Sequence, residues 1–178
     1  MIILLVIGLA IVAFIASKFW TIVMGAGWSP TPLPTVRRML SLAEVKPEDI
    51  VYDLGCGDGR IIIMASREYG ARSIGIEADP FRYLYTWVRI IISGLSKKTG
   101  LIWGNFFRRD LSEASVVTLF LSQAANNNLK RKLSQELKPG TRIVSYYWTF
   151  DGWRPKKVDE KFGVYLYEIG SENSRSRD

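Results

Sequence analysis

The sequence predicts an α/β fold: a doubly wound, mostly parallel sheet with an antiparallel last strand, preceded by an N-terminal transmembrane helix. Three observations support this prediction. Short β-branched runs alternate with apolar helical stretches along residues 50–147, which is typical of parallel strands joined by helices. Two short runs near the C-terminal end flank a turn and predict a closing hairpin. A long apolar run opens the chain.

Length and composition limit the possible functions. The 178 residues suit one domain. Lys and Arg number 24 against 17 Asp and Glu, and the formal charge of +7 indicates nucleic acid, anionic lipid or an acidic protein as partner, or equally a solvated basic surface. The chain has no histidine and one cysteine, Cys56. Disulfides within the chain, Cys/His zinc sites and histidine triads are therefore excluded, and no metal site is expected.

Residues 1–24 predict a single membrane-spanning helix. Their one charged side chain is Lys18, and the run is long enough to cross a bilayer. A cleaved signal peptide is the rival, but its positive leading region is missing. A soluble helix docked on the domain would leave too much apolar surface to hide. Lys18 lies near the C-terminal end of the run, Arg37 and Arg38 follow it, and no positive residue precedes it, which predicts the following domain on the cytoplasmic or matrix side.

The globular domain is expected over residues 25–170, with a polar, disordered tail at 171–178. Residues 29–34 predict a stiff extended connector, because proline disfavours helix at and before its own position. Thr35 is expected to cap a helix over 36–43. A strand over 50–54, a helix over 61–69 and a strand over 74–76 follow.

A glycine-rich loop, residues 55–60, joins the first strand to its helix and contains Gly55, Gly57 and Gly59. Glycine lets the chain turn tightly and lets the backbone approach a ligand closely. The helix that follows presents free N–H groups and a positive dipole end. Glu77 lies about 20 residues further on, where nucleotide-binding βαβ units place a carboxylate for ribose hydroxyls. The spacing predicts an adenosine-containing ligand; an ordinary tight turn is the alternative.

Asp53, at the end of the first strand, distinguishes between such ligands. The dinucleotide fingerprint has glycine where this chain has Arg60. A carboxylate at position 53 would repel a pyrophosphate but suits the ammonium of a methionine moiety. These differences favour S-adenosylmethionine over NAD. Asn105, at the carboxyl end of the third strand, is either placed to contact an adenine amino group or an ordinary loop asparagine.

The later elements complete the sheet. Asp79 is expected to cap, and Pro80 to open, a helix that ends near Gly94. Its aromatic side chains are interpreted as packing residues rather than a base-stacking platform; they are Tyr83, Tyr85 and Trp87. Strands are predicted over 99–103, 116–121 and 141–147, with a polar loop at 126–128 leading into a helix to Leu137. The hairpin pairs 157–159 with 164–169.

Several short motifs carry a resemblance to a known family. They are Pro30-Thr31-Pro32, Asp53-Leu54-Gly55-Cys56-Gly57-Asp58-Gly59-Arg60, Asp110-Leu111-Ser112, Lys132-Leu133, Pro139-Gly140-Thr141-Arg142, and Trp153 with Pro155. With them the chain resembles the class I (seven-strand) methyltransferases. More narrowly, it resembles the small membrane-anchored protein-lysine methyltransferases related to the mitochondrial enzymes that act on the ATP synthase c-subunit and the adenine nucleotide translocase.

The resemblance implies cofactor contacts at Asp53, Gly55, Gly57 and Glu77, and a role for the Pro-Thr-Pro segment over the cofactor or the acceptor lysine. Two departures concern the protein substrate. After the fifth strand, Tyr146-Tyr147-Trp148 is more aromatic than the Arg-Phe type usual in the family, and Ala78-Asp79 replaces a leucine after Glu77.

A pocket edged by Thr31, Tyr147 and Trp148 is expected to hold the lysine stem and amine. The predicted function is protein-lysine N-methylation by a single-pass membrane enzyme that acts on membrane or membrane-associated proteins. RNA, DNA or small-molecule methylation is the alternative. Enzymes that methylate base amino groups commonly carry Asn/Asp-Pro-Pro-aromatic after the fourth strand, where this chain has Leu121-Ser122-Gln123-Ala124. This disfavours nucleic acid without excluding it.

Overall fold

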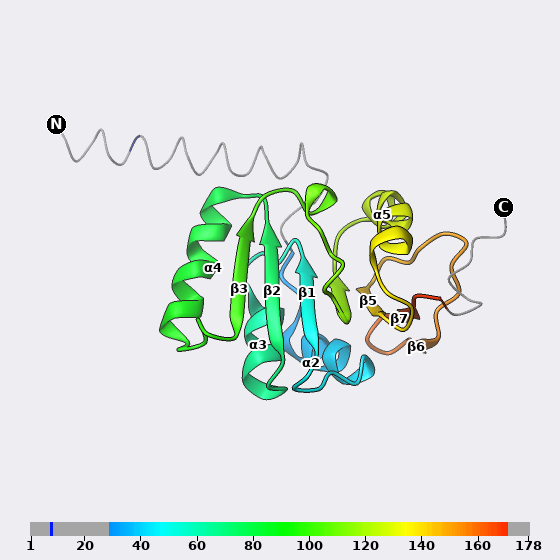
Figure 1. The fold of residues 1–178 in the computed structure, drawn as a ribbon, viewed down its shortest axis with the longest axis horizontal. Helices are drawn as coiled ribbons and strands as arrows, with labels where there is room; N and C mark the ends of the chain where they lie inside the picture. The colour runs from blue at the N-terminus through cyan, green and yellow to red at the C-terminus, as the bar shows by residue number, and fades with distance from the viewer. Residues whose placement is uncertain (1–7, 9–28, 171–178) are drawn as a thin grey trace.

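The computed structural model describes residue 8 and residues 29–170, which contain a seven-stranded sheet in the order β3-β2-β1-β4-β5-β7-β6 (Figure 1). Strands β1 to β5 pair in parallel, and β7 runs antiparallel to both β5 and β6. The strands are β1 (Ile50–Leu54), β2 (Arg72–Glu77), β3 (Thr99–Trp103), β4 (Val116–Leu119), β5 (Arg142–Tyr146), β6 (Lys157–Asp159) and β7 (Val164–Glu168). This order confirms the predicted α/β architecture with an antiparallel last strand.

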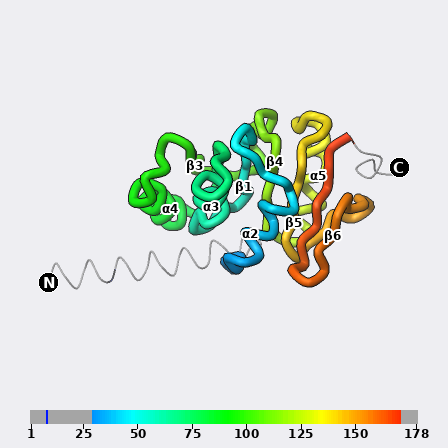
Figure 2. Tube along the Cα trace, turned by 90° about the horizontal axis from the view of Figure 1, so that it is seen from below, coloured from blue at the N-terminus to red at the C-terminus, as the bar shows by residue number. Residues whose placement is uncertain are grey.

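Helices cover the two faces of the sheet unequally (Figures 1 and 2). Helices α2 (Leu33–Leu42) and α3 (Arg60–Glu68) share a core with Val51, Val116 and Val144, on one face. Helix α4 (Pro80–Ile92) joins α3 through a smaller cluster and packs near β3. Helix α5 (Gln123–Glu136) covers the opposite face, and a 3-10 turn, η1 (Phe106–Arg108), follows β3.

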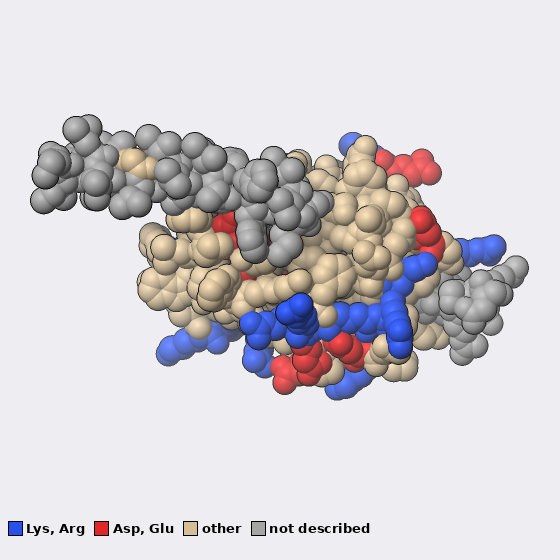
Figure 3. All heavy atoms as spheres, turned by 90° about the horizontal axis from the view of Figure 1, so that it is seen from above, with Lys and Arg blue, Asp and Glu red and all other residues tan. Residues whose placement is uncertain are grey.

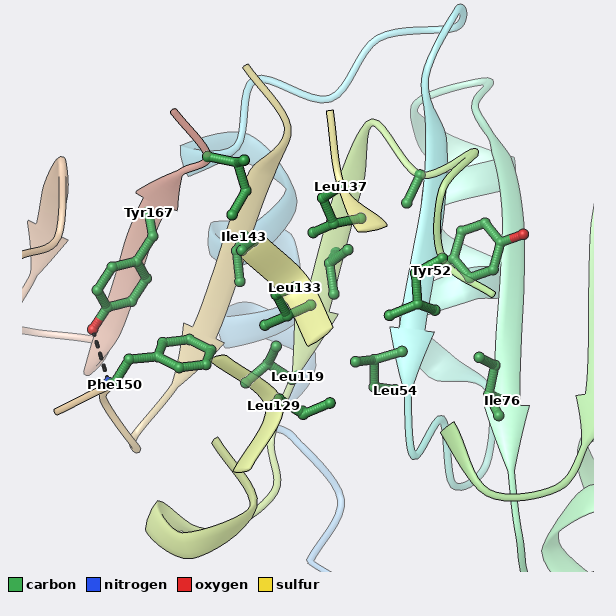
Figure 4. Close-up of a cluster of buried hydrophobic side chains, with 14 of the residues drawn as sticks. Tyr52, Leu54, Ile76, Leu119, Leu129, Leu133, Leu137, Ile143, Phe150 and Tyr167 are labelled. Carbon is green, nitrogen blue, oxygen red and sulfur yellow. Dashed lines mark hydrogen bonds between the residues drawn. The ribbon is translucent and has the colours of Figure 1, made fainter. Parts of the chain in front are cut away.

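The larger core lies under α5 (Figure 4). Leu129, Leu133 and Leu137 point from α5 and its end toward Leu54 and Ile143 of the sheet. Along β1, Tyr52 and Leu54 belong to this core, whereas Val51 belongs to the core on the α2–α3 face. Side chains of a strand alternate between faces, so Asp53 lies on the same face as Val51. The two apolar cores lie on the faces of the sheet, and the polar side chains of Asp53 and Glu77 lie at the carboxyl ends of its strands.

Two predicted boundaries are wrong. Helix α2 begins at Leu33, with Pro32 at the N-cap position and Pro34 inside the first turn, so Thr35 is not the cap. Proline is tolerated there because the first N–H groups of a helix have no intrahelical acceptor. The predicted polar loop at 126–128 belongs to α5, whose cap is Ser122: its hydroxyl accepts a hydrogen bond from the Ala125 amide at 3.2 Å.

Apart from residue 8, the predicted membrane span (1–24) lies outside the described residues, as does the predicted tail (171–178). In the part of the chain that the structure describes, none of the helices combines the length and the apolar character needed to span a bilayer.

Candidate active site

The glycine loop leaves β1 and enters α3 in a conformation that favours glycine. Gly55, Gly57 and Gly59 have φ angles of 75°, 57° and 74°. The amides of Gly55 and Cys56 donate to the carbonyl of Ile76 at 2.9 and 3.1 Å, which fastens the loop to β2. A Cβ at position 59 would lie 2.5 Å from Cγ2 of Thr86 in α4. The loop therefore needs glycine both for its backbone angles and for its close approach to α4.

Two buried carboxylates flank this loop. Asp53 is 3% exposed, and its Oδ1 accepts a hydrogen bond from Thr118 Oγ1 at 2.8 Å. Thr118 is the residue opposite Asp53 in the β1–β4 register. Glu77, 5% exposed, accepts from the Gly57 amide (Oε2, 2.9 Å) and from the Asp79 amide (Oε1, 2.9 Å). The adjacent strand ends thus bring together the loop and both predicted acids.

Burial dominates the electrostatics of the two acids. It raises the pKa of Asp53 to about 7; the bond from Thr118 opposes this rise and the charge of Glu77 adds to it. Burial also raises the pKa of Glu77, against the stabilising bonds from the Asp79 and Gly57 amides and the charge of Arg82. No Lys or Arg of the described residues forms an ion pair with Asp53. A ligand ammonium would supply the missing positive charge, so the residues present fit S-adenosylmethionine.

A charged network that the sequence analysis missed ties the loop to its neighbours. Arg60 pairs with Asp58 (Nη2–Oδ2, 2.7 Å) and donates from Nη1 to the Thr31 carbonyl at 2.7 Å. Arg89 of α4 also pairs with Asp58 at 3.0 Å. Burial alone would raise the pKa of Asp58, but the bonds and charge of the two arginines lower it. In the sequence Arg60 is only a departure from the dinucleotide fingerprint, because its spacing from the glycines does not indicate a bond to Thr31, which lies 29 residues upstream.

Aromatic side chains border the other end of the site, where β5 stops. Tyr147 is 62% exposed and has a φ angle of 68°, in the left-handed region. The Tyr147 and Trp148 rings meet edge to face, with centroids 4.9 Å apart. Asn126 of α5, fully buried, donates from Nδ2 to the carbonyls of Trp148 and Thr149 at 3.0 and 3.2 Å. Its Oδ1 has no hydrogen-bond partner among the described residues.

The structure brings some predicted site residues together and separates others. Asp53, the three glycines and Glu77 form one group, and Tyr147 and Trp148 form a second, beyond β4. Thr31 is buried, and its carbonyl is fastened to Arg60 of the first group. Asn105 caps η1, where its Oδ1 accepts from the Phe107 amide at 2.9 Å. Thr118 and Asn126 were missed; a polar residue in an otherwise apolar strand was the available signal for Thr118.

A family model described as the ANTKMT methyltransferase domain matches residues 53–157, a span from Asp53 to β6. The chain belongs to this family. It is 47% identical over 148 residues to a protein-lysine N-methyltransferase of Saccharolobus islandicus (strain REY15A), covering 79% of this chain and 92% of the relative. It is 28% identical to the ATP synthase c-subunit lysine N-methyltransferase of Xenopus laevis, covering 80% of this chain and 63% of that one.

A solved structure gives the same fold. The crystal structure of an RNA methyltransferase from Salinibacter ruber in complex with S-adenosyl-L-homocysteine is 42% identical, with a TM-score of 0.79. The match covers 81% of this chain and 95% of that one. This chain is therefore an S-adenosylmethionine-dependent methyltransferase, and the predicted family, cofactor and enzyme class are confirmed.

Proposed function

We propose that this enzyme is a protein-lysine N-methyltransferase, held at a membrane by residues 1–24 and acting on membrane or membrane-associated proteins. The observation that carries the proposal is the pairing of a buried carboxylate cradle with an exposed aromatic border on one sheet edge, in a chain of this family. Relatives named for lysine methylation of a protein, including the ATP synthase c-subunit, support the choice of acceptor.

In this proposal the group around the glycine loop holds the cofactor. Asp53 binds the methionine ammonium, because it is a buried carboxylate with which no Lys or Arg of residues 29–170 forms an ion pair. Glu77 binds the ribose hydroxyls with the lone pairs that its two amide bonds leave free. The backbone of Gly55, Gly57 and Gly59 lies against the ligand, and Asn105 is a candidate contact for the adenine. S-adenosylmethionine, when bound, supplies an electrophilic methyl group on its sulfonium sulfur.

The aromatic border receives the acceptor lysine. Rings such as Tyr147 and Trp148 contact the alkyl stem and the amine, and the bound substrate then excludes water from the amine. Loss of hydration disfavours the charged form, so the pKa of the acceptor amine falls and its proton passes to the solvent before the methyl transfer. A strong protein base is then unnecessary, in keeping with a chain that has no histidine. Thr31 is assigned the inner edge of this pocket, because Arg60 fastens its backbone to the cofactor loop.

Membrane attachment is part of the proposal. The composition of residues 1–24 supports a single span, with the methyltransferase domain on the cytoplasmic or matrix side. Attachment would raise the local concentration of substrates in the same membrane.

The test is to incubate membranes and soluble extract with the full chain and S-adenosylmethionine labelled in its methyl group. Mass spectrometry of the labelled material then identifies the acceptor. We expect label on lysine in membrane-fraction proteins, and none with the Asp53→Ala variant. Label confined to soluble proteins would contradict the membrane substrates, and label on arginine or on lipid would contradict lysine as acceptor.

RNA is a second candidate acceptor. It is favoured by the Salinibacter ruber structure, which is described as an RNA methyltransferase, and by the net charge of +7. The segment after β4, Leu121-Ser122-Gln123-Ala124, lacks the motif common in enzymes that methylate base amino groups. The same labelling reaction decides: nuclease-sensitive label would establish RNA, and protease-sensitive label would establish protein.

A further inference from the structure

Helix α4 presents its apolar side to solvent. Seven of its large apolar side chains are between 40% and 81% exposed: Phe81, Leu84, Tyr85, Trp87, Val88, Ile91 and Ile92. Its fully buried side chains are few, with Thr86 and Ile90 facing the domain. At 100° per residue, the seven exposed side chains span a continuous arc of about 160°. The prediction that the aromatic residues of this helix are packing residues is therefore wrong for Tyr85 and Trp87.

This apolar surface extends beyond the helix. Trp103, at the end of the edge strand β3, is 58% exposed, and its indole N–H donates to the Ala78 carbonyl just before α4. We call the seven α4 side chains and Trp103 the α4 face. In Figure 3 the end of the molecule that carries α4 and β3 is largely free of charged side chains, which gather along the lower edge of the view. A soluble monomer rarely exposes so large a contiguous apolar patch without a partner.

We propose that the α4 face is a second membrane-contact surface, which lies in the headgroup region of a bilayer. The inference rests on the proposed membrane attachment. A helix with an apolar face rich in Trp, Tyr, Phe and Leu is typical of helices that lie in the plane of the interface. Trp and Tyr prefer this region because their rings are apolar with one polar atom.

The connection of the apolar run to the domain supports a bilayer as the occupant. Residues 1–24 are separated by only four residues from Ser29, and Thr31 is hydrogen-bonded to Arg60 at the glycine loop. The same loop holds α4: Thr86 Oγ1 donates to the Gly57 carbonyl at 2.6 Å, and Arg89 pairs with Asp58. A bilayer that contains residues 1–24 would therefore lie near the loop that holds the middle of α4.

Charge supports the same occupant. The arginines of α4 are turned inward, where Arg82 and Arg89 pair with Asp79 and Asp58, so that they do not interrupt the apolar arc. Exposed cations stand at its borders instead: Lys97 and Lys98 follow the helix, and Arg109 donates to the Trp103 carbonyl at 2.6 Å. Such flanking cations complement anionic headgroups.

Packing of residues 1–24 onto α4 explains the exposed α4 face less well than a bilayer does. A helix that is apolar on all sides has more apolar surface than one face of another helix can cover. A bilayer can cover the apolar surface of residues 1–24 and the α4 face together.

The test uses the full chain with one added cysteine, Leu84→Cys on the α4 face or Val158→Cys on β6 as the control. The two side chains are similarly exposed, at 57% and 45%, and the native Cys56 is buried. Each variant is spin-labelled and reconstituted into vesicles of phosphatidylcholine and phosphatidylglycerol. Collisions with oxygen, which concentrates in lipid, are compared with collisions with a water-soluble nickel chelate. Calorimetry with S-adenosylmethionine shows that the labelled variants are folded.

We expect the oxygen-to-nickel collision ratio to rise on vesicle addition for position 84 and to stay at its aqueous value for position 158. An aqueous ratio at both positions, in protein that floats with the vesicles, would overturn the α4 face while leaving attachment intact. Exclusion of both reagents from position 84 would indicate coverage by the chain itself, and dipolar broadening would indicate a second copy. Either result would overturn the inference. Protein that fails to float would overturn attachment and the α4 face together.

Discussion

The two ends of the proposed site lie at the carboxyl ends of the parallel strands but differ in structure. At the ends of β1 and β2, the carboxylates of Asp53 and Glu77 are at most 5% exposed and are held by a threonine hydroxyl and two backbone amides. At the end of β5, Tyr147 is 62% exposed and sits on backbone in the left-handed region. The cofactor end is buried and hydrogen-bonded, and the aromatic end is open.

This difference indicates that one end of the site binds the cofactor and the other binds the acceptor. A buried, hydrogen-bonded cradle is organised before its ligand arrives, so that ordering it on binding costs little. Exposed aromatic rings are accessible to the acceptor lysine of a protein substrate that binds afterwards. Substitutions at the first end should therefore change cofactor affinity, and substitutions at the second should change only the transfer to the acceptor.

The largest effect is expected from Asp53→Ala. Removal of the only carboxylate assigned to the methionine ammonium should abolish cofactor binding, because a charged hydrogen bond in a buried site is lost. The fold should persist, since Asp53 is bonded to a single side chain, Thr118. Isothermal calorimetry with S-adenosylmethionine measures the loss. Asp159→Ala, which removes a carboxylate on β6, is the control and should bind normally; equal binding by both variants would remove Asp53 from the site.

The next effect tests whether the glycine loop depends on the close approach of its backbone at Gly59 to Thr86 of α4. Gly59→Ala introduces a Cβ at a φ of 74°, 2.5 Å from Cγ2 of Thr86. Left-handed strain plus overpacking should lower the free energy of unfolding by about 3 kcal/mol. Gly94→Ala has a similar φ, 68°, and no atom within 4 Å of the new Cβ, so it should lose only about 1 kcal/mol. Urea unfolding of both variants measures the difference, and equal losses would show that strain alone matters.

Much of the cofactor end could be predicted from the sequence. Its chemistry follows from a local unit in which a strand, three glycines and a second acid occur at fixed spacing, and backbone geometry then fixes where Asp53 and Glu77 lie. Asp79 also caps α4 as predicted, accepting from the amides of Phe81 and Arg82. Local rules suffice where the partners are close in sequence.

The aromatic end was less predictable because its geometry depends on distant residues. The conformation after β5 is held by Asn126, about 20 residues upstream, and that asparagine lies in a helix where the polar run 126–128 predicted a loop. Ser122 caps that helix and allows the run to be helical. The exposure of α4 was missed for a related reason: apolar periodicity shows that a helix has an apolar face, but not which partner covers it.

A smaller effect concerns the proton on Asp53. Burial raises its pKa from an ordinary value of 3.8 to about 7, so the folded protein without cofactor holds a proton that the unfolded chain has lost. Stability from this group is present at low pH and is lost as pH rises toward 7. The free energy of unfolding should fall by up to about 1.4 kcal/mol per pH unit in this window. Urea unfolding from about pH 5 to about pH 8, compared with Asp53→Asn, isolates this contribution; parallel pH profiles would contradict the raised pKa.

The smallest effect on stability tests whether the strained backbone at Tyr147 serves substrate binding. Tyr147→Gly removes a side chain from left-handed backbone, where residues other than glycine are strained, and should raise the free energy of unfolding by up to about 1 kcal/mol. Methyl transfer to the acceptor should nevertheless fall, with cofactor affinity unchanged.

Glu44→Gly is the matched control for Tyr147→Gly, because Glu44 also has a positive φ, 52°, but lies away from the aromatic border. Its exposed pair with Lys157 contributes little to stability, so this variant should gain stability and keep full activity. Thermal unfolding and labelled methyl transfer measure both quantities for each variant. If Tyr147→Gly kept full activity as well, the open aromatic end would not hold the acceptor, and the division between the two ends of the site would fail at this residue.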